Sequence, residues 1–265
     1  MLGMLRAIVL ARGLGSRMRE RDDHSPLTPE QQRAADAGLK AMMPLHGRPF
    51  LDYVLSHIAD AGVRKVALVV APDHDTLRQH FVEQPPTRVD VSFVVQPEAR
   101  GTADAVVAAE SWIAGDPFLV MNADNLYPVP ALRDLAALDG PGFPAFDADD
   151  LVATSNIPAE RVRAFAAVEI DDHGYLRSIV EKPADRPRNF VSMNVWRFDA
   201  RIFDACRDVP RSARGEHELP EAVGLAVARG MRIKAIPARG PVLDLSRRSD
   251  TAEVARRLEG TRPCP

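Results

Sequence analysis

The chain has 265 residues, of which 46% are hydrophobic and 27% charged, and its formal net charge is -3. This composition is expected to give one large domain, or one domain with an added lobe, around a full core. The slightly acidic balance argues against a nucleic-acid-binding protein, which would carry a basic face. The two cysteines, Cys206 and Cys264, form neither a disulfide framework nor a metal-binding spacing. Neither a signal peptide nor an apolar run that could cross a bilayer is apparent, so we expect a cytoplasmic protein without nucleic-acid or membrane partners.

The first predicted element is a buried strand over residues 5–11, and a short glycine-rich loop follows it. The loop contains Gly13 and Gly15, with Ser16 and Arg17 directly behind them. Glycines after a first strand let the backbone approach a ligand, and a hydroxyl and a guanidinium beside them suit phosphate oxygens. The loop fits neither the GxxxxGK[ST] nor the GxGxxG pattern, so an ordinary strand-to-helix turn explains it equally well.

A polar, charged segment over residues 19–38 separates this loop from Lys40. Within it, Thr28 as N-cap, Pro29 as the first helical residue and Gln31 as the end of a capping box predict a short helix that ends near residue 37. Because both ends of the segment are anchored beside Arg17 and Lys40, we expect a lid that closes over a ligand bound there. A plain surface excursion or an oligomer contact is the alternative.

Strands alternate with helices through the rest of the first half. The apolar spacing predicts helices over residues 50–61, 73–83 and 101–114, and strands over residues 65–71, 89–95 and 118–121. This alternation implies right-handed crossovers and an α/β fold with a Rossmann-like, mostly parallel central sheet flanked by helices. Ligands of such sheets bind beyond the carboxyl ends of the strands, which is where Arg17 and Asp124 are expected.

The second half is predicted to be richer in strands. Residues 140–144 are expected to form a loop, followed by a hairpin of strands 164–170 and 175–181 and by strands over 190–198, 231–236 and 242–245. Helices are expected over residues 200–206, 219–229 and 249–258, and the last residues are expected to fray. We therefore divide the single domain into a core of about residues 1–139, an interleaved smaller β-rich lobe of about 140–240, and a C-terminal part of about 241–265.

Two aspartates stand at predicted strand ends far apart in the chain, Asp124 in MNADN and Asp244 in VLDLS. Two carboxylates and phosphate oxygens together form the oxygen-rich site that Mg²⁺ prefers. Lys182, in the triplet Glu181-Lys182-Pro183, follows another strand and can meet a second phosphate. Taken singly, an aspartate at a strand end is more often a turn residue or helix cap, and a Glu-Lys-Pro triplet is usually a solvated edge.

Together and in this order, the segments resemble the sugar-1-phosphate nucleotidyltransferases, most closely the short glucose-1-phosphate thymidylyl- and uridylyltransferases. The resemblance extends over nearly the whole chain. It rests on LARGLGSRM at 10–18, KAMMP at 40–44, QPEARGTADA at 96–105, NADN at 122–125, FAAVEID at 165–171, EKP at 181–183, SARGE at 212–216, and Asp244. Each motif is weak alone, but their shared order makes the resemblance specific.

This resemblance implies a Mg²⁺-dependent transfer of a nucleotidyl group from an NTP to a sugar-1-phosphate, forming an NDP-sugar and pyrophosphate. It implies that Arg17 and Lys40 are catalytic, that Asp124 and Asp244 hold Mg²⁺, and that the lobe of about residues 140–240 binds the sugar. The nucleotide is expected to contact Leu10, Ala11, Gly13, Gly15, Ser16, Gln96, Gly101 and Thr102. The sugar phosphate is expected to contact Glu181, Lys182, Asn194 and Arg214. A phosphate oxygen is already anionic, so the nucleophile needs no general base, and the chemistry calls for positioning and positive charge.

Several residues depart from the family's pattern. Arg12, Ala123 and Ala166 stand where a small residue or a glycine is usual, and Asn194 stands where a glycine is common. These departures bear on the substrate more than on the reaction. The sequence leaves open a cytidylyltransferase acting on a non-sugar alcohol phosphate, and a catalytically inactive regulatory subunit that senses nucleotide sugars. The overall likeness favours a uracil or thymine nucleotide, although residues 101–105 also resemble adenylyl- and guanylyltransferases, and a homo-oligomer is compatible with the sequence.

Overall fold

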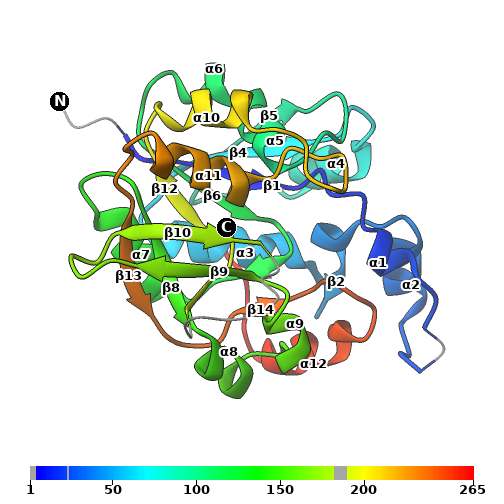
Figure 1. The fold of residues 1–265 in the computed structure, drawn as a ribbon. Coiled ribbons are helices and arrows are strands. Elements are labelled where there is room, and N and C mark those ends of the chain that lie inside the picture. The colour runs from blue at the N-terminus through cyan, green and yellow to red at the C-terminus, as the bar shows by residue number, and fades with distance from the viewer. Residues whose placement is uncertain (1–3, 23, 182–189) are drawn as a thin grey trace.

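A computed structural model of the chain describes residues 4–22, 24–181 and 190–265. Its main sheet is built from β1 (Arg6–Leu10), β4 (Lys65–Val70), β5 (Asp90–Val95), β6 (Phe118–Asn122), β8 (Gly142–Asp147), β9 (Ala166–Ile170), β10 (Leu176–Val180), β11 (Phe190–Ser192), β12 (Trp196–Phe198) and β13 (Lys234–Ala238). The strand order is β10-β9-β11-β8-β12-β6-β1-β4-β5, and β13 pairs with β8 (Figure 1). Two short pairs lie outside it, β2 (Pro44–Leu45) with β3 (Arg48–Pro49) and β7 (Asn125–Leu126) with β14 (Leu243–Asp244).

The expected α/β architecture is confirmed, with a mixed sheet whose first half is parallel. Strands β5, β4, β1 and β6 are parallel neighbours, whereas β12 is antiparallel to both β6 and β8. Because β12 pairs on both sides, one continuous sheet runs through the two halves of the chain. The carboxyl ends of β1 and β6 therefore lie side by side at one edge.

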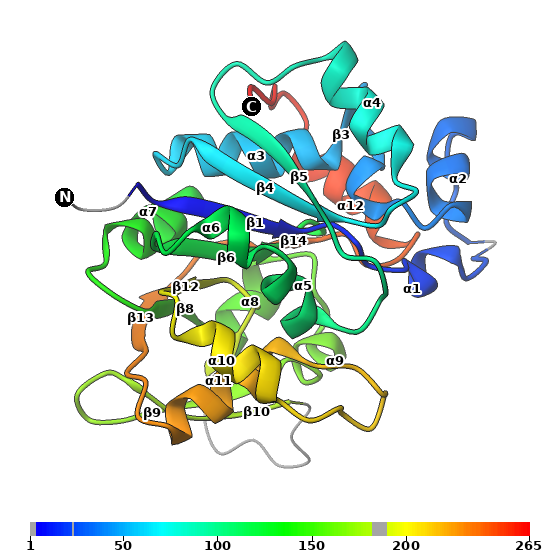
Figure 2. The same cartoon turned by 90° about the horizontal axis from the view of Figure 1, so that it is seen from above.

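Helices cover both faces of the sheet (Figure 2). They are α1 (Ser16–Arg19), α2 (Pro29–Asp36), the 3₁₀ turn η1 (Lys40–Met42), α3 (Phe50–Asp60), α4 (Asp75–Glu83), α5 (Thr102–Ala108), α6 (Glu110–Ile113), α7 (Val129–Ala137), α8 (Ala148–Thr154), α9 (Ala159–Val162), α10 (Ile202–Asp208), α11 (Leu219–Ala228) and α12 (Asp250–Arg257). Alternating residues of β1 serve the two faces: Val9 packs in a core with α3, α4 and α7, and Ile8 packs in a second core with α5, α10 and α11. Fully buried strands of this kind read as continuous apolar runs.

Three local expectations are corrected by the structure. The expected loop at 140–144 is wrong, because residues 142–147 form β8, in which Phe143 and Phe146 are fully buried. The expected strand over 190–198 is interrupted at Asn194, whose φ of 57° lies in the left-handed region. The helix expected over 101–114 is broken at Ala109 into α5 and α6. Proline, glycine and isolated polar residues made these segments ambiguous, and burial decided them.

The C-terminal tail, expected to fray, is docked instead. The Pro265 carbonyl accepts hydrogen bonds from the backbone N–H groups of Thr87 (2.8 Å) and Arg88 (3.0 Å). The N–H of Cys264 donates to Ser56 Oγ at 2.7 Å. These bonds satisfy backbone groups that a frayed tail would leave to solvent.

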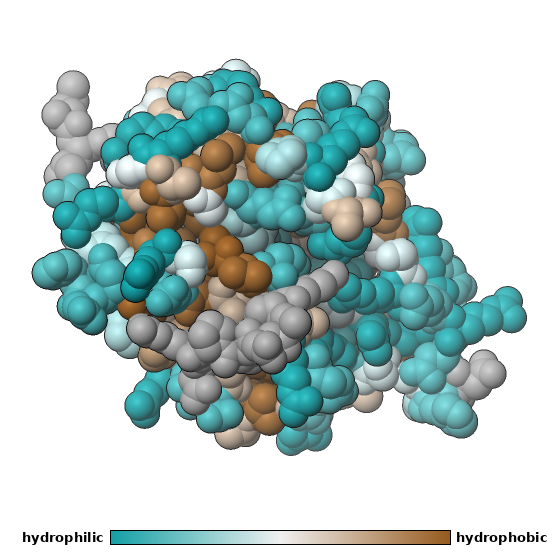
Figure 3. Space-filling model, viewed as in Figure 1, coloured by the Kyte–Doolittle hydropathy of each residue, from teal (hydrophilic) through white to brown (hydrophobic). Residues whose placement is uncertain are grey.

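The surface on the side of Figure 1 is mainly hydrophilic, and the apolar side chains that show there gather over α11 and β10 (Figure 3). Val180 of β10 is 52% exposed, while Ile179 and Leu225 are partly buried.

Among the described residues, no helix is both long enough and apolar enough to span a membrane.

Candidate active site

A cavity of about 480 Å³ opens beyond the carboxyl ends of β1 and β6 and reaches into the second half of the chain. Loops after these strands line one side of it, and residues of β11, α9 and the segment before α11 line the other. The cavity thus lies where a parallel sheet places its ligands. It is lined by residues from both halves, so the two halves together form one site.

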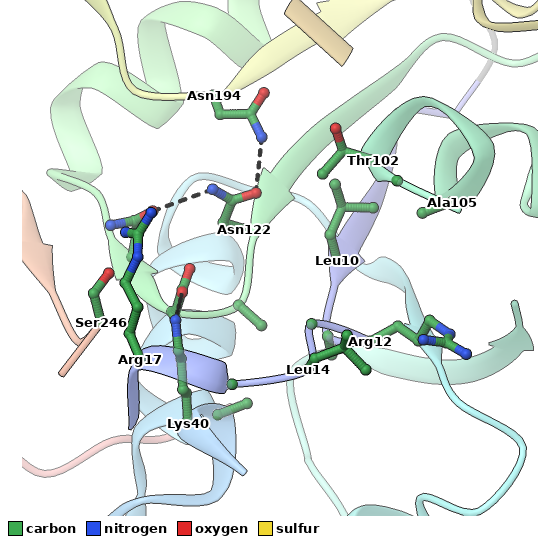
Figure 4. A pocket seen from close by; sticks show the side chains of 18 of the residues that line it. Leu10, Arg12, Leu14, Arg17, Lys40, Thr102, Ala105, Asn122, Asn194 and Ser246 are labelled. Carbon is green, nitrogen blue, oxygen red and sulfur yellow. Dashed lines mark hydrogen bonds and ion pairs between the residues drawn. The ribbon is translucent and has the colours of Figure 1, made fainter. Parts of the chain in front are cut away.

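The cations expected to be catalytic enter this cavity from two neighbouring elements. Arg17 extends from α1 and Lys40 from η1, and both point toward the end of β6 (Figure 4). Lys40 Nζ lies 3.0 Å from Asp124 Oδ2, and the two side chains are 19% and 26% exposed. Within the described parts of the chain, no ion pair engages Arg17. A free guanidinium beside a paired lysine and aspartate provides a partly exposed place for an anion.

The end of the cavity expected to hold the base is fixed by hydrogen bonds around Gln96, which is only 2% exposed. Its side-chain amide donates both hydrogens, to the Gly101 carbonyl at 3.1 Å and to Asp104 Oδ2 at 2.7 Å. Arg12 Nε donates to the Gln96 carbonyl at 3.1 Å and Arg12 Nη2 to the Pro97 carbonyl at 3.2 Å. Arg12 is therefore fastened to the loop after β5 and contributes to the wall of the cavity.

Gly101 is required by the way this loop approaches the second half. Its φ is 114°, and a Cβ built on it would lie 2.4 Å from the His217 carbonyl oxygen. The next residue, Thr102, accepts a hydrogen bond from the N–H of Leu219 at 2.8 Å and so caps α11. Only glycine combines this φ with so close a backbone approach. The predicted nucleotide residues Gly101 and Thr102 thus also join the two halves.

A chain of side-chain hydrogen bonds crosses the floor of the cavity. Trp196 Nε1 donates to Asn194 Oδ1 (3.0 Å). Asn194 Nδ2 donates to Asn122 Oδ1 (2.8 Å), the bond marked between these two side chains in Figure 4. Asn122 Nδ2 then donates to Asn125 Oδ1 (3.3 Å), and Asn125 Nδ2 donates to Asp244 Oδ1 (3.1 Å). Each of the three asparagine amides both accepts and donates a hydrogen bond, so its orientation is defined. The chain of hydrogen bonds ends on the carboxylate of Asp244.

Asp244 is buried and already surrounded by donors. Its Oδ2 lies 2.6 Å from Arg161 Nη1, and its Oδ1 also accepts from Ser246 Oγ at 2.8 Å. Burial, reinforced by the nearby charge of Asp124, raises the pKa of Asp244, and the contact with Arg161 opposes that rise. Its carboxylate therefore faces a different environment from that of Asp124.

The opposite end of the cavity carries the residues expected to bind the sugar phosphate. Arg214 Nη2 lies 2.7 Å from Glu218 Oε1 and 3.8 Å from Glu181 Oε1. Burial raises the pKa of Glu218, and the guanidinium of Arg214 opposes this. Arg214 is 47% exposed, so it remains accessible to an anion. Lys182 lies outside the described residues.

The structure brings the predicted site residues into one cavity. Those that line it are Leu10, Ala11, Gly13, Gly15, Ser16, Arg17, Lys40, Gln96, Gly101, Thr102, Asp124, Glu181, Asn194, Arg214 and Asp244. The sequence analysis missed Arg161 and Glu218, which also line it. Arg161 belongs to α9, which, like α7 and α8, the periodicity did not reveal, and no local signal marked it.

A divalent cation would fit beside Asp124 more readily than beside Asp244. The Asp124 side chain is 26% exposed and, among the described residues, has Lys40 as its ion-pair partner, whereas the Asp244 side chain is 4% exposed and has three donors. In the part of the chain that is described, no group of three or more His, Cys, Asp or Glu side chains is placed to hold a metal. Mg²⁺ accepts such a site, because it commonly binds one or two carboxylates together with substrate phosphates and water.

The fold and this site define a nucleotidyltransferase. Residues 6–257 match the nucleotidyl transferase family, and the chain belongs to that family. Among its relatives, the chain is 29% identical over 255 residues to the UTP–glucose-1-phosphate uridylyltransferase AglF of Haloferax volcanii, covering 96% of this chain and 97% of that protein. It is 26% identical over 276 residues to a glucose-1-phosphate thymidylyltransferase of Streptomyces antibioticus, covering 97% of this chain and 69% of that one.

A solved structure has the same fold. UDP-glucose pyrophosphorylase complexed with UDP-glucose superposes with a TM-score of 0.76 at 19% identity, covering 98% of this chain and all of that one. The expected family and enzyme class are confirmed by these matches. The roles of individual residues stay predictions.

Proposed function

We propose that this chain transfers the nucleotidyl group of UTP or dTTP to a hexose-1-phosphate, forming an NDP-sugar and releasing pyrophosphate. The observation that supports this most is the convergence of Arg17, Lys40 and Asp124 at one end of a cavity whose other end carries Glu181 and Arg214. One end is suited to a triphosphate and the other to a polar, anionic acceptor. The choice of nucleotide and sugar follows the relatives, which are a UTP–glucose-1-phosphate uridylyltransferase and a glucose-1-phosphate thymidylyltransferase.

The chemistry assigned to the chain's own residues is positioning and charge stabilisation. The attacking phosphate oxygen is already anionic, so no general base is required, and the barrier comes from bringing two anions together in line. Arg17 and Lys40 hold the triphosphate and stabilise charge that develops on it in the transition state. Arg214, together with Lys182, holds the sugar phosphate, and Glu181 accepts hydrogen bonds from sugar hydroxyls.

We assign Mg²⁺ to the end of the cavity that binds the triphosphate, with Asp124 as its protein ligand. Asp244, the second aspartate of the family's motifs, lies beside Asp124. When bound there, the cation would neutralise part of the negative charge on the triphosphate. We assign Gln96 to contact the nucleotide base. Both of its amide hydrogens are donated within the protein, so its Oε1 can accept a hydrogen bond from a base N–H, which uracil and thymine offer.

The assignment is tested by pyrophosphate release across UTP, dTTP, GTP, ATP and CTP with a panel of sugar-1-phosphates and non-sugar alcohol phosphates. UTP or dTTP with a hexose-1-phosphate is expected to give the highest kcat/KM. Turnover confined to CTP with a non-sugar alcohol phosphate would instead indicate a cytidylyltransferase. Binding of a nucleotide sugar without any turnover would indicate a regulatory subunit.

Asp124→Asn is expected to lower kcat by about a hundredfold or more, because the nucleotide end loses the charge that holds the cation. The matched control is Asp134→Asn, an exposed aspartate of α7 outside the cavity, which should keep normal turnover. Circular dichroism establishes that both variants are folded. Near-normal turnover of folded Asp124→Asn, with undiminished Mg²⁺ dependence, would contradict the assignment.

A further inference from the structure

Asp124 and Asp244 are neighbours with different partners. Asn125 and Asp244 face each other in the β7–β14 pair, and the N–H of Leu245 donates to the Asp124 carbonyl at 2.9 Å. Two carboxylates this close would attract a dication strongly if both were free. Lys40 pairs with Asp124 and Arg161 pairs with Asp244, so the formal charge of these four side chains is zero.

Arg161 does more than touch Asp244. Its guanidinium also binds Asp250 through two bonds, Nη1 to Oδ2 at 3.0 Å and Nη2 to Oδ1 at 2.8 Å. Asp250 Oδ2 in turn accepts from the backbone N–H groups of Ser246 (2.9 Å) and Arg247 (2.7 Å). The Arg161 side chain is only 13% exposed. A planar guanidinium held by two carboxylates in this way is oriented far more rigidly than a lysine ammonium would be.

The backbone around Asp244 is held from the same side. Asn156, in the turn between α8 and α9, donates to the Asp244 carbonyl at 2.7 Å and accepts from the Asp244 N–H at 2.8 Å. The α8–α9 segment therefore holds the main chain of Asp244 through Asn156 and pairs with its carboxylate through Arg161. Asp124, by contrast, has a single ion-pair partner within the described ranges, Lys40, and lines the cavity.

We propose that Arg161 is a positioning residue that occupies Asp244, so that a divalent cation arriving with the nucleotide has Asp124 as its only protein carboxylate. The inference rests on the proposed function in that the nucleotide supplies the remaining oxygen ligands. Arg161 takes over the neutralising role that a metal plays between two free acids. It also holds the loop that carries Ser246 against the cavity.

Mn²⁺ binding to the intact protein, followed by electron paramagnetic resonance without substrates, tests this directly. Asp124→Asn should weaken Mn²⁺ binding about tenfold or more, whereas Asp244→Asn should change it less than about twofold. Arg161→Met should tighten binding about tenfold, because it frees the second carboxylate. The tighter Mn²⁺ binding should vanish in the Arg161→Met/Asp244→Asn double variant. It should also be absent in Arg161→Lys, which keeps the positive charge. Arg163→Met, an exposed arginine just after α9, is the matched control.

Equal weakening by Asp124→Asn and Asp244→Asn would overturn the proposal, as would a folded Arg161→Met variant with unchanged or weaker Mn²⁺ binding. A purely structural role for Arg161 predicts no tightening at all. If Arg161→Met fails to fold, the comparison of Asp124→Asn with Asp244→Asn in the otherwise natural chain still decides. The readout needs no turnover, so failure of the proposed function in the pyrophosphate assay would be seen separately.

Discussion

The loop that carries Arg17 depends on one glycine. Gly15 has φ 62° and precedes α1, and a Cβ built on it would lie 2.2 Å from the carbonyl oxygen of Gly38. Gly15 and Gly38 thus let the loop before α1 approach the end of the 19–38 segment closely, next to Arg17 and Lys40. Gly13, two residues earlier, has open space around its Cα and no positive φ. Gly13 and Gly15, which lie in the same loop, therefore have different roles.

Gly15→Ala is expected to destabilise the fold by about 2 kcal/mol or more, because it adds left-handed backbone strain to a clash with backbone atoms that cannot rotate away. Gly13→Ala, the matched control, should stay within about 0.5 kcal/mol of the natural chain. Urea unfolding followed by circular dichroism measures both free energies. Equal unfolding midpoints for the two variants would show that the Gly15–Gly38 contact is dispensable.

Among the elements, the 19–38 segment has one anchored part and one exposed part. The capping box of α2 is confirmed, with Gln31 N donating to Thr28 Oγ1 and Thr28 N donating to Gln31 Oε1. Arg248, 4% exposed, donates to the Met18 carbonyl at 2.9 Å and pairs with Asp36 at 2.6 Å. It thereby ties α1 to the end of α2. The described residues 20–22 and 24–26 have only local side-chain hydrogen bonds, whereas Leu27 packs against the core, so any lid motion is assigned to residues 20–22 and 24–26.

Limited trypsin digestion tests this division. In the free protein, cleavage after Arg21 should precede cleavage after Arg33, because the capping box and Arg248 hold α2, whereas residues 20–22 have only local side-chain hydrogen bonds. UTP with Mg²⁺ should slow cleavage after Arg21 as the segment closes. Arg248→Met should expose Arg33 to cleavage, while Arg247→Met, the neighbouring control, should not. Identical cleavage after Arg21 with and without ligand would contradict the lid and favour a plain surface excursion.

For the molecule as a whole, the important feature is that one sheet runs through both halves. Trp196 pairs with Val120 of β6, and Arg197 pairs with Gly142 of β8. The two helix-covered cores lie on opposite faces of the same sheet rather than in separate halves of the chain. The division into a nucleotide core and a sugar lobe, which stays a prediction, is therefore one of function, since both parts contribute strands to the same main sheet.

The whole chain is accordingly expected to unfold in a single transition. Trp112→Phe leaves Trp196 of β12 as the sole tryptophan, so its fluorescence reports the junction between the halves while circular dichroism reports all helices. Both signals should give the same urea midpoint. The natural chain, with Trp112 in α6, serves as the control. Separate midpoints for the two probes would indicate that the halves unfold independently.

The sequence alone determined the parts of this protein that depend on local pattern. Apolar runs predicted β1, β4 and β6, because strands buried on both faces must be apolar along their length. The capping box of α2 followed from side chains that bond within one turn. The ordered motifs predicted the family and the residues that line the cavity, since their chemistry is carried by residue type and order.

Only the tertiary structure decided the features that depend on distant partners. Residues 142–147 resemble a loop in sequence, yet burial of Phe146 in one core and of Phe143 in the other makes them a central strand. The pairing of Arg161 with Asp244 joins residues 83 positions apart, and no local pattern encodes it. The sequence motifs assign the same role, that of a Mg²⁺ ligand, to Asp124 and Asp244. Their different surroundings arise from packing, because the charge that each carboxylate faces is set by whichever side chain the fold brings beside it.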